Sequence, residues 1–313
     1  MIKKVIHIAD IHIPNSEEAR PFSKMLERFL VELNEEVKNN NRDEVRIVIA
    51  GDVFEQKNKS SKEADDMFHY MLNYLNVIAH TIIIAGNHDM LENNLNRTDA
   101  MTPTFNIANV YENITYLDKE LQYKSGKIID DNVIWVLYSM FDKFKCPDIK
   151  GIKKAYPNHR IIGLYHGSIN GAVTDIGQQM DNGIDTNIFE ECDCVMAGHI
   201  HKHQELKRNG VPIVYAGSLF QKDLGENITG HGFVVWDLEN MTYKLHEVAN
   251  DYRMYKFRIT DYEDITEDKE KLINYWWRSI VTLFWVSCDT KYEIPPPITS
   301  AFLIKINVFL VLP

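Results

Sequence analysis

The sequence predicts an α/β fold, in which buried strands alternate with helices and polar side chains gather where the strands end. Two observations lead to this prediction. Short runs rich in isoleucine and valine, without polar alternation, recur between residues 3 and 201, as expected for strands buried on both faces. The segments between the first of these runs carry apolar residues at helical spacing, and strands buried on both faces need helical cover.

Two helices are predicted within the first eighty residues. The first covers residues 17–38, where apolar side chains recur at helical spacing and Pro21 suits the first turn. In the second, Ser60 and Glu63 fit a capping box that opens the helix. Its apolar stripe consists of Met67, Phe68, Met71, Leu72 and Leu75.

The second half of the chain changes character. After residue 167 the runs VPIVYAGSL, GFVVWDLE and TYKLHEV predict hairpin-connected strands, consistent with a second sheet. A further change near Asn250 predicts a domain boundary between residues 1–250 and residues 251–313. Residues 273–313 hold only five charged residues among forty-one, and three interpretations stay open. They are strands of a small second domain, an apolar partner-binding surface, or an aberrant tail created by a frameshift.

The composition narrows the class of protein. With 313 residues, 25% of them charged and 45% hydrophobic, the chain is an ordinary globular protein of one large or two small domains. Acidic residues outnumber basic ones 45 to 34, and the net charge of −11 excludes a protein that holds nucleic acid simply by being basic. It does not exclude nucleic acid as a substrate, because bound divalent metals change the local charge of a site.

The N-terminal segment, the length of the apolar stretches and the spacing of the cysteines predict the cellular compartment. The opening MIKKVIHIAD has too short an apolar run for a signal peptide, and no stretch reaches about eighteen uninterrupted apolar residues. The four cysteines include no CxxC pair. We therefore expect a cytoplasmic protein in a reducing environment, with no membrane among its partners.

Five predicted strands end in residues that can bind metal. Ligands of α/β folds collect at the carboxyl ends of strands. The side chains at these ends are Asp10 and His12, Asp52, Asn87 and His88, His166, and His199 and His201. Asp10 and His12 are two residues apart, so their side chains point the same way if the chain stays extended. A single GD or GNH could equally be a strand-to-loop turn, but five such endings together indicate chemistry.

These residues form a donor set for two metals. Leaving His88 aside, two carboxylates, one amide and four imidazoles exceed what one metal needs, but they suit two metals that share a carboxylate. Mixed carboxylate and imidazole ligands favour manganese, iron or zinc over calcium. Two metals about 3.5–4 Å apart are the usual apparatus for hydrolysing phosphoesters.

The same motifs resemble a known family. DxH at 10–12, GD at 51–52, GNHD at 86–89, HG at 166–167 and GHxH at 198–201 are similar, in this order, to the calcineurin-like metallophosphoesterases. The resemblance covers roughly residues 1–250. It implies a four-layer α/β/β/α metallophosphoesterase sandwich, here with a short or truncated C-terminal capping region.

The resemblance also implies a role for each site residue. One metal takes Asp10, His12, Asp52 and His201, and the other takes Asp52, Asn87, His166 and His199, so that Asp52 bridges. His88, which is no ligand in the family, contacts the scissile phosphate or protonates the leaving group. A histidine suits that role because its ordinary pKa lies near neutrality.

Finer features resemble the SbcD-type DNA repair nucleases and their phage recombination counterparts. They are GDVFEQKNKSSKEA, YAGSLFQKDLGE at 215–226 and HGFVVWDLE at 231–239. This resemblance implies a DNA exonuclease or single-strand endonuclease with two divalent metals, manganese first and iron, zinc or magnesium as alternatives. It further implies a homodimer bound to an SbcC-type coiled-coil ABC ATPase, in the host cytoplasm if phage-encoded. Glu55 stands where some members have a histidine, which leaves the balance between the two nuclease activities open.

Two other functions stay open. One is a two-metal phosphoesterase that acts on a nucleotide, a phosphoprotein or another small phosphoester, with the same ligands. The other is a non-enzymatic metal scaffold for a recombination complex. The presence of His88 argues against the scaffold, because a scaffold has no need of an acid.

Overall fold

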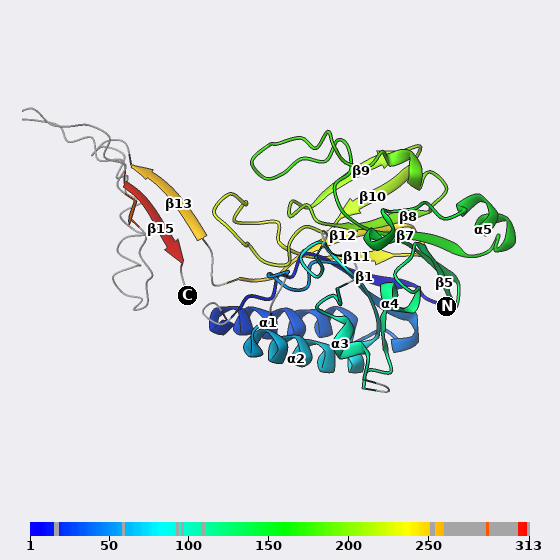
Figure 1. Cartoon of the computed structure of the whole chain (residues 1–313), viewed down its shortest axis with the longest axis horizontal. Coiled ribbons are helices and arrows are strands. Elements are labelled where there is room, and N and C mark those ends of the chain that lie inside the picture. The colour runs from blue at the N-terminus through cyan, green and yellow to red at the C-terminus, as the bar shows by residue number, and fades with distance from the viewer. Residues whose placement is uncertain are drawn as a thin grey trace, which may run out of the picture. The chain divides into compact units, whose positions relative to one another are not determined.

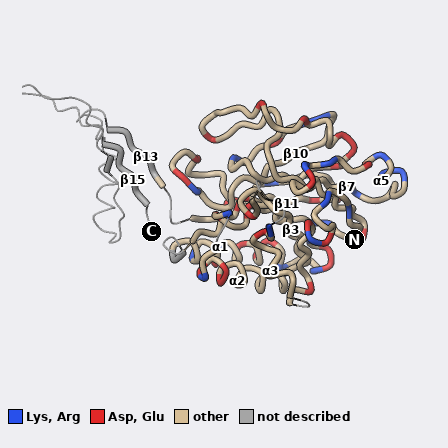
Figure 2. The backbone as a smooth tube through the Cα atoms, viewed as in Figure 1, with Lys and Arg blue, Asp and Glu red and all other residues tan. Residues whose placement is uncertain are grey.

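The computed structural model describes most of the chain. The described residues are 1–15, 19–57, 60–91, 94, 97–107, 110–250, 254–259, 286–287 and 306–311. Contacts divide the chain into two units, Met1–Ala249 and Asn250–Pro313, and each is described by itself. Among the described residues, no helix combines the length and the apolar character needed to span a membrane. Figure 2 shows acidic and basic residues interspersed along the first unit.

The first unit contains a six-stranded sheet in the order β12-β11-β1-β2-β3-β4. Its strands are β1 (Lys4–Ile8), β2 (Val45–Ala50), β3 (His80–Ile84), β4 (Ile114–Tyr116), β11 (Gly232–Asp237) and β12 (Thr242–Glu247). Strands β1 to β4 run parallel, and β11 pairs antiparallel with β1, with Val235 opposite Ile6. The sequence predicts that β11 and β12 belong to a second sheet, and this prediction is wrong. They extend the first sheet instead, because β11 occupies the edge of β1 that β2 leaves free.

A second six-stranded sheet has the order β5-β6-β7-β8-β10-β9. Its strands are β5 (Gly126–Asp130), β6 (Val133–Tyr138), β7 (Arg160–His166), β8 (Cys194–Gly198), β9 (Gln204–Arg208) and β10 (Val211–Tyr215). Strands β6, β7, β8 and β10 run parallel. Both sheets therefore bring the carboxyl ends of parallel strands to an edge, where the polar motifs of the sequence lie.

The two sheets pack face to face between helical layers (Figure 1). The apolar core between the sheets includes the fully buried Trp135 and Trp236. A second core lies under the helices α1 (Ala19–Val37) and α2 (Lys62–Ile78), and a third lies on the outer face of the second sheet, under α5 (Ile149–Ala155). The remaining helices are the short α3 (Thr102–Phe105) and α4 (Leu117–Glu120). This four-layer arrangement confirms the predicted α/β/β/α sandwich.

The second helix begins one residue later than the sequence predicted. The Ser61 side chain accepts a hydrogen bond of 3.2 Å from the amide of Ala64, so Ser61 and not Ser60 is the N-cap. A capping hydroxyl satisfies one of the amides that the first helical turn leaves unpaired. The predicted stripe of α2 is buried against the first sheet, as expected for an amphipathic covering helix.

In the second unit, the described residues form a three-stranded antiparallel sheet in the order β13-β15-β14. Its strands are β13 (Met254–Ile259), β14 (Val286–Ser287) and β15 (Ile306–Val311). The rest of the predicted tail at 273–313 lies outside the described residues, so its three interpretations stay predictions.

Candidate metal centre

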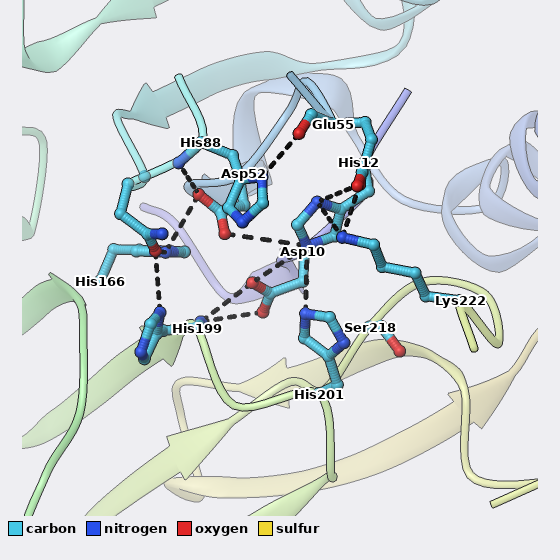
Figure 3. Close-up of polar contacts among 12 residues, drawn as sticks. Asp10, His12, Asp52, Glu55, His88, His166, His199, His201, Ser218 and Lys222 are labelled. Carbon is cyan, nitrogen blue, oxygen red and sulfur yellow. Dashed lines mark hydrogen bonds and ion pairs between the residues drawn. The ribbon is translucent and has the colours of Figure 1, made fainter. Parts of the chain in front are cut away.

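The candidate site lies where strands of both sheets end (Figure 3). Asp10 and His12 follow β1, Asp52 follows β2, Asn87 and His88 follow β3, His166 ends β7, and His199 and His201 follow β8. The structure brings all eight predicted side chains together. Asp10, Asp52 and His166 are almost completely buried, which is costly for charged groups unless they are paired or bind metal.

The first cluster consists of Asp10, His12 and His201, whose ligand atoms lie within 4.8 Å of one another. The Nε2 atoms of His12 and His201 are 3.0 Å apart, and Nε2 of His12 is 4.0 Å from Oδ1 of Asp10. Two nitrogens bound to one metal at about 2.1 Å and at right angles are about 3 Å apart. The facing imidazoles therefore fit a common metal ion.

The second cluster consists of Asp52, His166 and His199. Oδ1 of Asn87 joins it, 2.8 Å from Nδ1 of His199 and 3.1 Å from Nε2 of His166. Oδ1 of Asp52 is 3.2 Å from Nε2 of His166, whereas its Oδ2 is 3.7 Å from Nε2 of His12. Asp52 thus turns one oxygen toward each cluster, which is the arrangement of a shared ligand.

Hydrogen bonds at Nδ1 of two imidazoles, those of His166 and His201, turn Nε2 toward the clusters. Nδ1 of His166 donates to the carbonyl oxygen of Ala50 at 2.7 Å. Nδ1 of His201 lies 2.5 Å from Oε1 of Glu226, whereas Nδ1 of His12 lies 3.1 Å both from Oε2 of Glu55 and from Nζ of Lys222. Such partners fix the tautomer and orientation of metal-binding histidines. The donor set and its spacing therefore fit two divalent metals.

Sequence reasoning missed the supporting role of Glu226. Its carboxylate side chain is only 6% exposed, and besides His201 it accepts a hydrogen bond of 2.8 Å from the amide of Lys222. The segment YAGSLFQKDLGE as a whole resembles the nuclease members, but nothing in its local pattern predicts a bond between Glu226 and a histidine 25 residues earlier.

Asp89 is a second residue that sequence reasoning left without a role. It is fully buried and accepts hydrogen bonds from the amides of Val53 and Phe54, both at 3.0 Å, and of Gly86 at 2.8 Å. Burial raises the pKa of this carboxyl to about 7. Asp89 therefore ties the loop after β2 to the loop after β3 and holds the ligands on both loops in register.

The backbone at the ligands is strained. Asp10, His12 and Asp52 have φ values of 51°, 52° and 52°, in the left-handed region that non-glycine residues avoid. The expected extended chain from Asp10 to His12 is therefore wrong, since β1 has already ended at Ile8. The amides of Asp10 and His12 donate instead to the carbonyls of Gly51 and Asp52, at 3.1 and 3.0 Å. Such strain costs about 1–3 kcal/mol per residue and is typical of functional sites.

Two motif glycines are required by close packing. A Cβ on Gly86 would lie 2.1 Å from the amide nitrogen of Asp52, and a Cβ on Gly51 would lie 2.3 Å from Nδ1 of His166. Gly51 also has a φ of +87°, which favours glycine. The glycines of GD and GNH thus allow the strand ends to approach each other closely enough for the ligands to meet.

The electrostatics of the site follow from burial and from the pairing of opposite charges. Burial raises the pKa of Asp10 to about 6 and lowers the pKa values of His12 and His199 to about 4 each. Burial also acts to raise the pKa of Asp52. The adjacent His166 outweighs burial, however, and holds the pKa of Asp52 well below its usual range. His12 and His199 therefore stay neutral, as ligands must be. Burial also acts to lower the pKa of His166, but Asp52 outweighs burial and the pKa is about 9, so a metal would have to displace a proton from this ring.

His88 lies outside the two clusters described above, in a third group of possible ligands that it forms with His12 and Glu55. Its amide donates to Oδ1 of Asp52 at 2.7 Å, and its Nδ1 donates to the carbonyl oxygen of Glu55 at 2.6 Å. Because a carbonyl can only accept, Nδ1 carries a proton and Nε2 is the nitrogen free to exchange one. The ring meets that of His12 edge to face, with centroids 4.8 Å apart. This placement suits a proton donor beside the metals.

A cavity of about 330 Å³ opens beside the histidines that follow β8. Two loops form its other walls, and its lining includes Ile176, Met180, His199, His201, Asp223 and Glu226. A hydrogen bond of 2.6 Å between Asn227 and Asp175 joins the two loops. A phosphoester bound at the metals could extend its organic part into this cavity.

Comparison with known proteins identifies the family. The family model of the calcineurin-like phosphoesterases matches residues 3–203. The chain is also 34% identical over 268 residues to an uncharacterized protein of Acanthamoeba polyphaga mimivirus, and the match covers 83% of this chain and 19% of the viral protein. The chain thus spans about a fifth of the length of that curated relative.

Two solved structures are similar at low identity. An archaeal phosphodiesterase is 12% identical with a TM-score of 0.35, covering 77% of this chain and 97% of that one. A Staphylococcus aureus protein assigned as a 5′-nucleotidase is 15% identical with a TM-score of 0.42, covering 90% and 60%. These TM-scores are too low to carry an argument. The family match stands on its own, and the chain belongs to the calcineurin-like phosphoesterases, hydrolases that act on phosphoesters and typically bind two divalent metals.

Proposed function

We propose that this phosphoesterase is a metal-dependent DNA nuclease of the SbcD type, which cuts phosphodiester bonds in DNA repair or recombination. The observation that carries the proposal is the loop of residues 215–226. Its sequence resembles the nuclease members of the family, and its Glu226 holds the ligand His201. The loop that marks the nuclease resemblance is therefore a working part of the metal centre.

The chemistry divides between the metals and the residues around them. When bound, two divalent metals neutralise charge on the phosphoryl group and lower the pKa of water. The residues of the two clusters would hold these metals, with Asp52 as the ligand that both share. As water forms its bond to phosphorus and the bond to the 3′ oxygen breaks, the doubly protonated ring of His88 would donate its Nε2 proton to that oxygen, while the Glu55 carbonyl keeps the Nδ1 proton in place. Proton donation of this kind contributes about 10²–10⁴-fold to the rate.

We further propose manganese as the metal, and as partners a second copy of the chain and an SbcC-type coiled-coil ABC ATPase. Manganese suits mixed carboxylate and imidazole ligands. The net charge of −11 supports a need for help in binding DNA, since the protein's own field repels a polyanion. The metals and the ATPase would supply the missing affinity.

A second candidate is a two-metal phosphoesterase for a nucleotide or another small phosphoester. The cavity beside His199 and His201 favours it, because about 330 Å³ lies at the lower end of pockets that hold small ligands. The metal ligands are the same in both proposals. Only the substrate separates them.

The test is nucleotide release from end-labelled linear DNA with manganese, run beside release of phosphate from free nucleotides. Asp52→Ala removes the shared ligand and should lower the rate at least about 10³-fold, because the charge stabilisation lost is worth several kcal/mol. Asp131→Ala is the matched control and should retain full activity. Asp131 is half-exposed and lies in the turn after β5, away from the carboxyl ends of the strands that carry the site. Circular dichroism checks the fold of both variants.

The outcomes separate the two proposals. Manganese-dependent cutting of DNA that is lost in Asp52→Ala alone supports the nuclease. Release of phosphate from nucleotides without cutting of DNA, also with the ATPase present, supports the small-substrate enzyme. Cutting that survives in Asp52→Ala would refute the assignment of the site.

A further inference from the structure

A lysine outside the predicted site reaches the metal centre. The Nζ atom of Lys222 lies 2.5 Å from Oε2 of Glu55 and 3.1 Å from Nδ1 of His12 (Figure 3). The Lys222 side chain is 25% exposed and that of Glu55 is 32% exposed, whereas His12 is buried. The ammonium group therefore lies between the partly exposed Glu55 and the buried His12, at the border of the site.

Both ends of Lys222 are tied to the metal-binding histidines. Glu55 holds the ammonium group and also faces Nδ1 of His12. Glu226 accepts a hydrogen bond from the Lys222 amide at 2.8 Å, while its other oxygen holds His201. The two carboxylates that orient the imidazoles of the first cluster thus also set the position of Lys222.

His88 shares this side of the site. Ligand atoms of His12, Glu55 and His88 lie within 4.8 Å of one another. The carboxylate that holds Lys222 therefore lies beside the histidine that we assign to the leaving group. A phosphate that reaches His88 comes close to the ammonium group of Lys222.

Negatively charged groups lie at the site that the ammonium group of Lys222 borders. Asp10, Asp52, Glu55 and Glu226 place four carboxyl groups at or next to the clusters, in a chain with a net charge of −11. A phosphoester anion has to approach these groups. An ammonium group has three donors, so Lys222 can turn from Glu55 toward a phosphate oxygen and form a charge-assisted hydrogen bond.

We infer that Lys222 binds a phosphate oxygen of the substrate, and that the phosphate competes with Glu55 for the ammonium group. The inference rests on the phosphoesterase activity of the proposed function and adds a substrate-binding residue to it. It holds for DNA and for small phosphoesters alike. Binding of inorganic phosphate therefore tests it even if the chain cuts no DNA.

The experiment is calorimetric titration of inorganic phosphate into the manganese-loaded protein. Lys222→Met should weaken phosphate binding about tenfold, the lower end of the range for a hydrogen bond to a charged group, because the site is partly exposed. Glu55→Gln should strengthen it, since the competing charge is gone. Lys222→Arg should restore most of the affinity. Lys244→Met is the matched control: that lysine is 66% exposed, pairs with Glu36 at 3.7 Å and should bind phosphate like the parent.

Each outcome decides the inference. Weaker binding in Lys222→Met together with stronger binding in Glu55→Gln supports it, and a higher KM with a smaller change in kcat on bis(p-nitrophenyl) phosphate should accompany the first. Equal phosphate affinity in the parent and Lys222→Met would show that the Glu55–Lys222 pair is only structural. Loss of manganese from Lys222→Met, measured in the same cell, would likewise overturn the inference, because the lysine would then serve the ligands rather than the substrate.

Discussion

Glu226→Gln should weaken the binding of one metal and leave the other unchanged. Glu226 uses its two oxygens separately, one for Nδ1 of His201 at 2.5 Å and one for the amide of Lys222 at 2.8 Å. Glutamine keeps a single oxygen, so one of the two donors would face an amide NH2 group. His201, the hydrogen-bond partner of Glu226, belongs to the first cluster only. The loss of affinity should therefore be confined to the metal of that cluster.

The magnitude follows from the lost hydrogen bond. A hydrogen bond to a charged and nearly buried acceptor is worth about 1.5–3 kcal/mol, and about 1.4 kcal/mol corresponds to tenfold in affinity. The metal of the first cluster should therefore bind about 10- to 100-fold more weakly, the usual cost of losing a partner of a metal-binding histidine.

Calorimetric titration of the metal-free protein with manganese resolves the two sites by their affinities. Glu205→Gln is the matched control, because this glutamate is on β9, 25% exposed and paired with Lys207 at 3.4 Å. Two affinities that both stay at the parent values in Glu226→Gln would refute the orienting role. Two that fall equally would refute the division into separate clusters.

Three further outcomes are expected. His88→Ala should lower kcat by about 10²–10⁴-fold while manganese still binds at two sites; an unchanged kcat would remove His88 from the chemistry. Gly86→Ala should abolish manganese binding, since its Cβ would lie 2.1 Å from a backbone nitrogen, whereas Gly126→Ala, with nothing closer than 3.4 Å, should bind manganese normally. Arg46→Met should lower the free energy of unfolding by about 2–4 kcal/mol, because Arg46 donates two hydrogen bonds to Asp130 at 2.7 and 2.8 Å. Burial raises the pKa of Asp130, but Arg46 outweighs it and the net pKa lies below the ordinary 3.8, so this contribution is present above pH 3.8 and lost in more acidic solution. Urea denaturation at neutral and acidic pH measures it, and a variant as stable as the parent at neutral pH would contradict it.

Much of the fold could be predicted because it depends on local patterns. Isoleucine- and valine-rich runs indicated the buried strands β1, β2, β3, β7 and β8, and the spacing of apolar residues indicated α1 and α2. The sheet that β11 joins could not be predicted from such local patterns. A hairpin pattern shows that two strands pair with each other, but which sheet they join depends on which edge is free, and here that edge belongs to β1.

The sequence by itself determined which residues can bind metal, because carboxylate, amide and imidazole side chains after buried strands are visible without coordinates. Only the tertiary structure decided how these residues are supported. Lys222 meets His12 across 210 residues, and Glu226 meets His201 across 25. Such contacts arise where loops from different strands meet at the edge of two packed sheets. No local periodicity encodes that meeting, because it depends on the strand order and on the path of each loop through space.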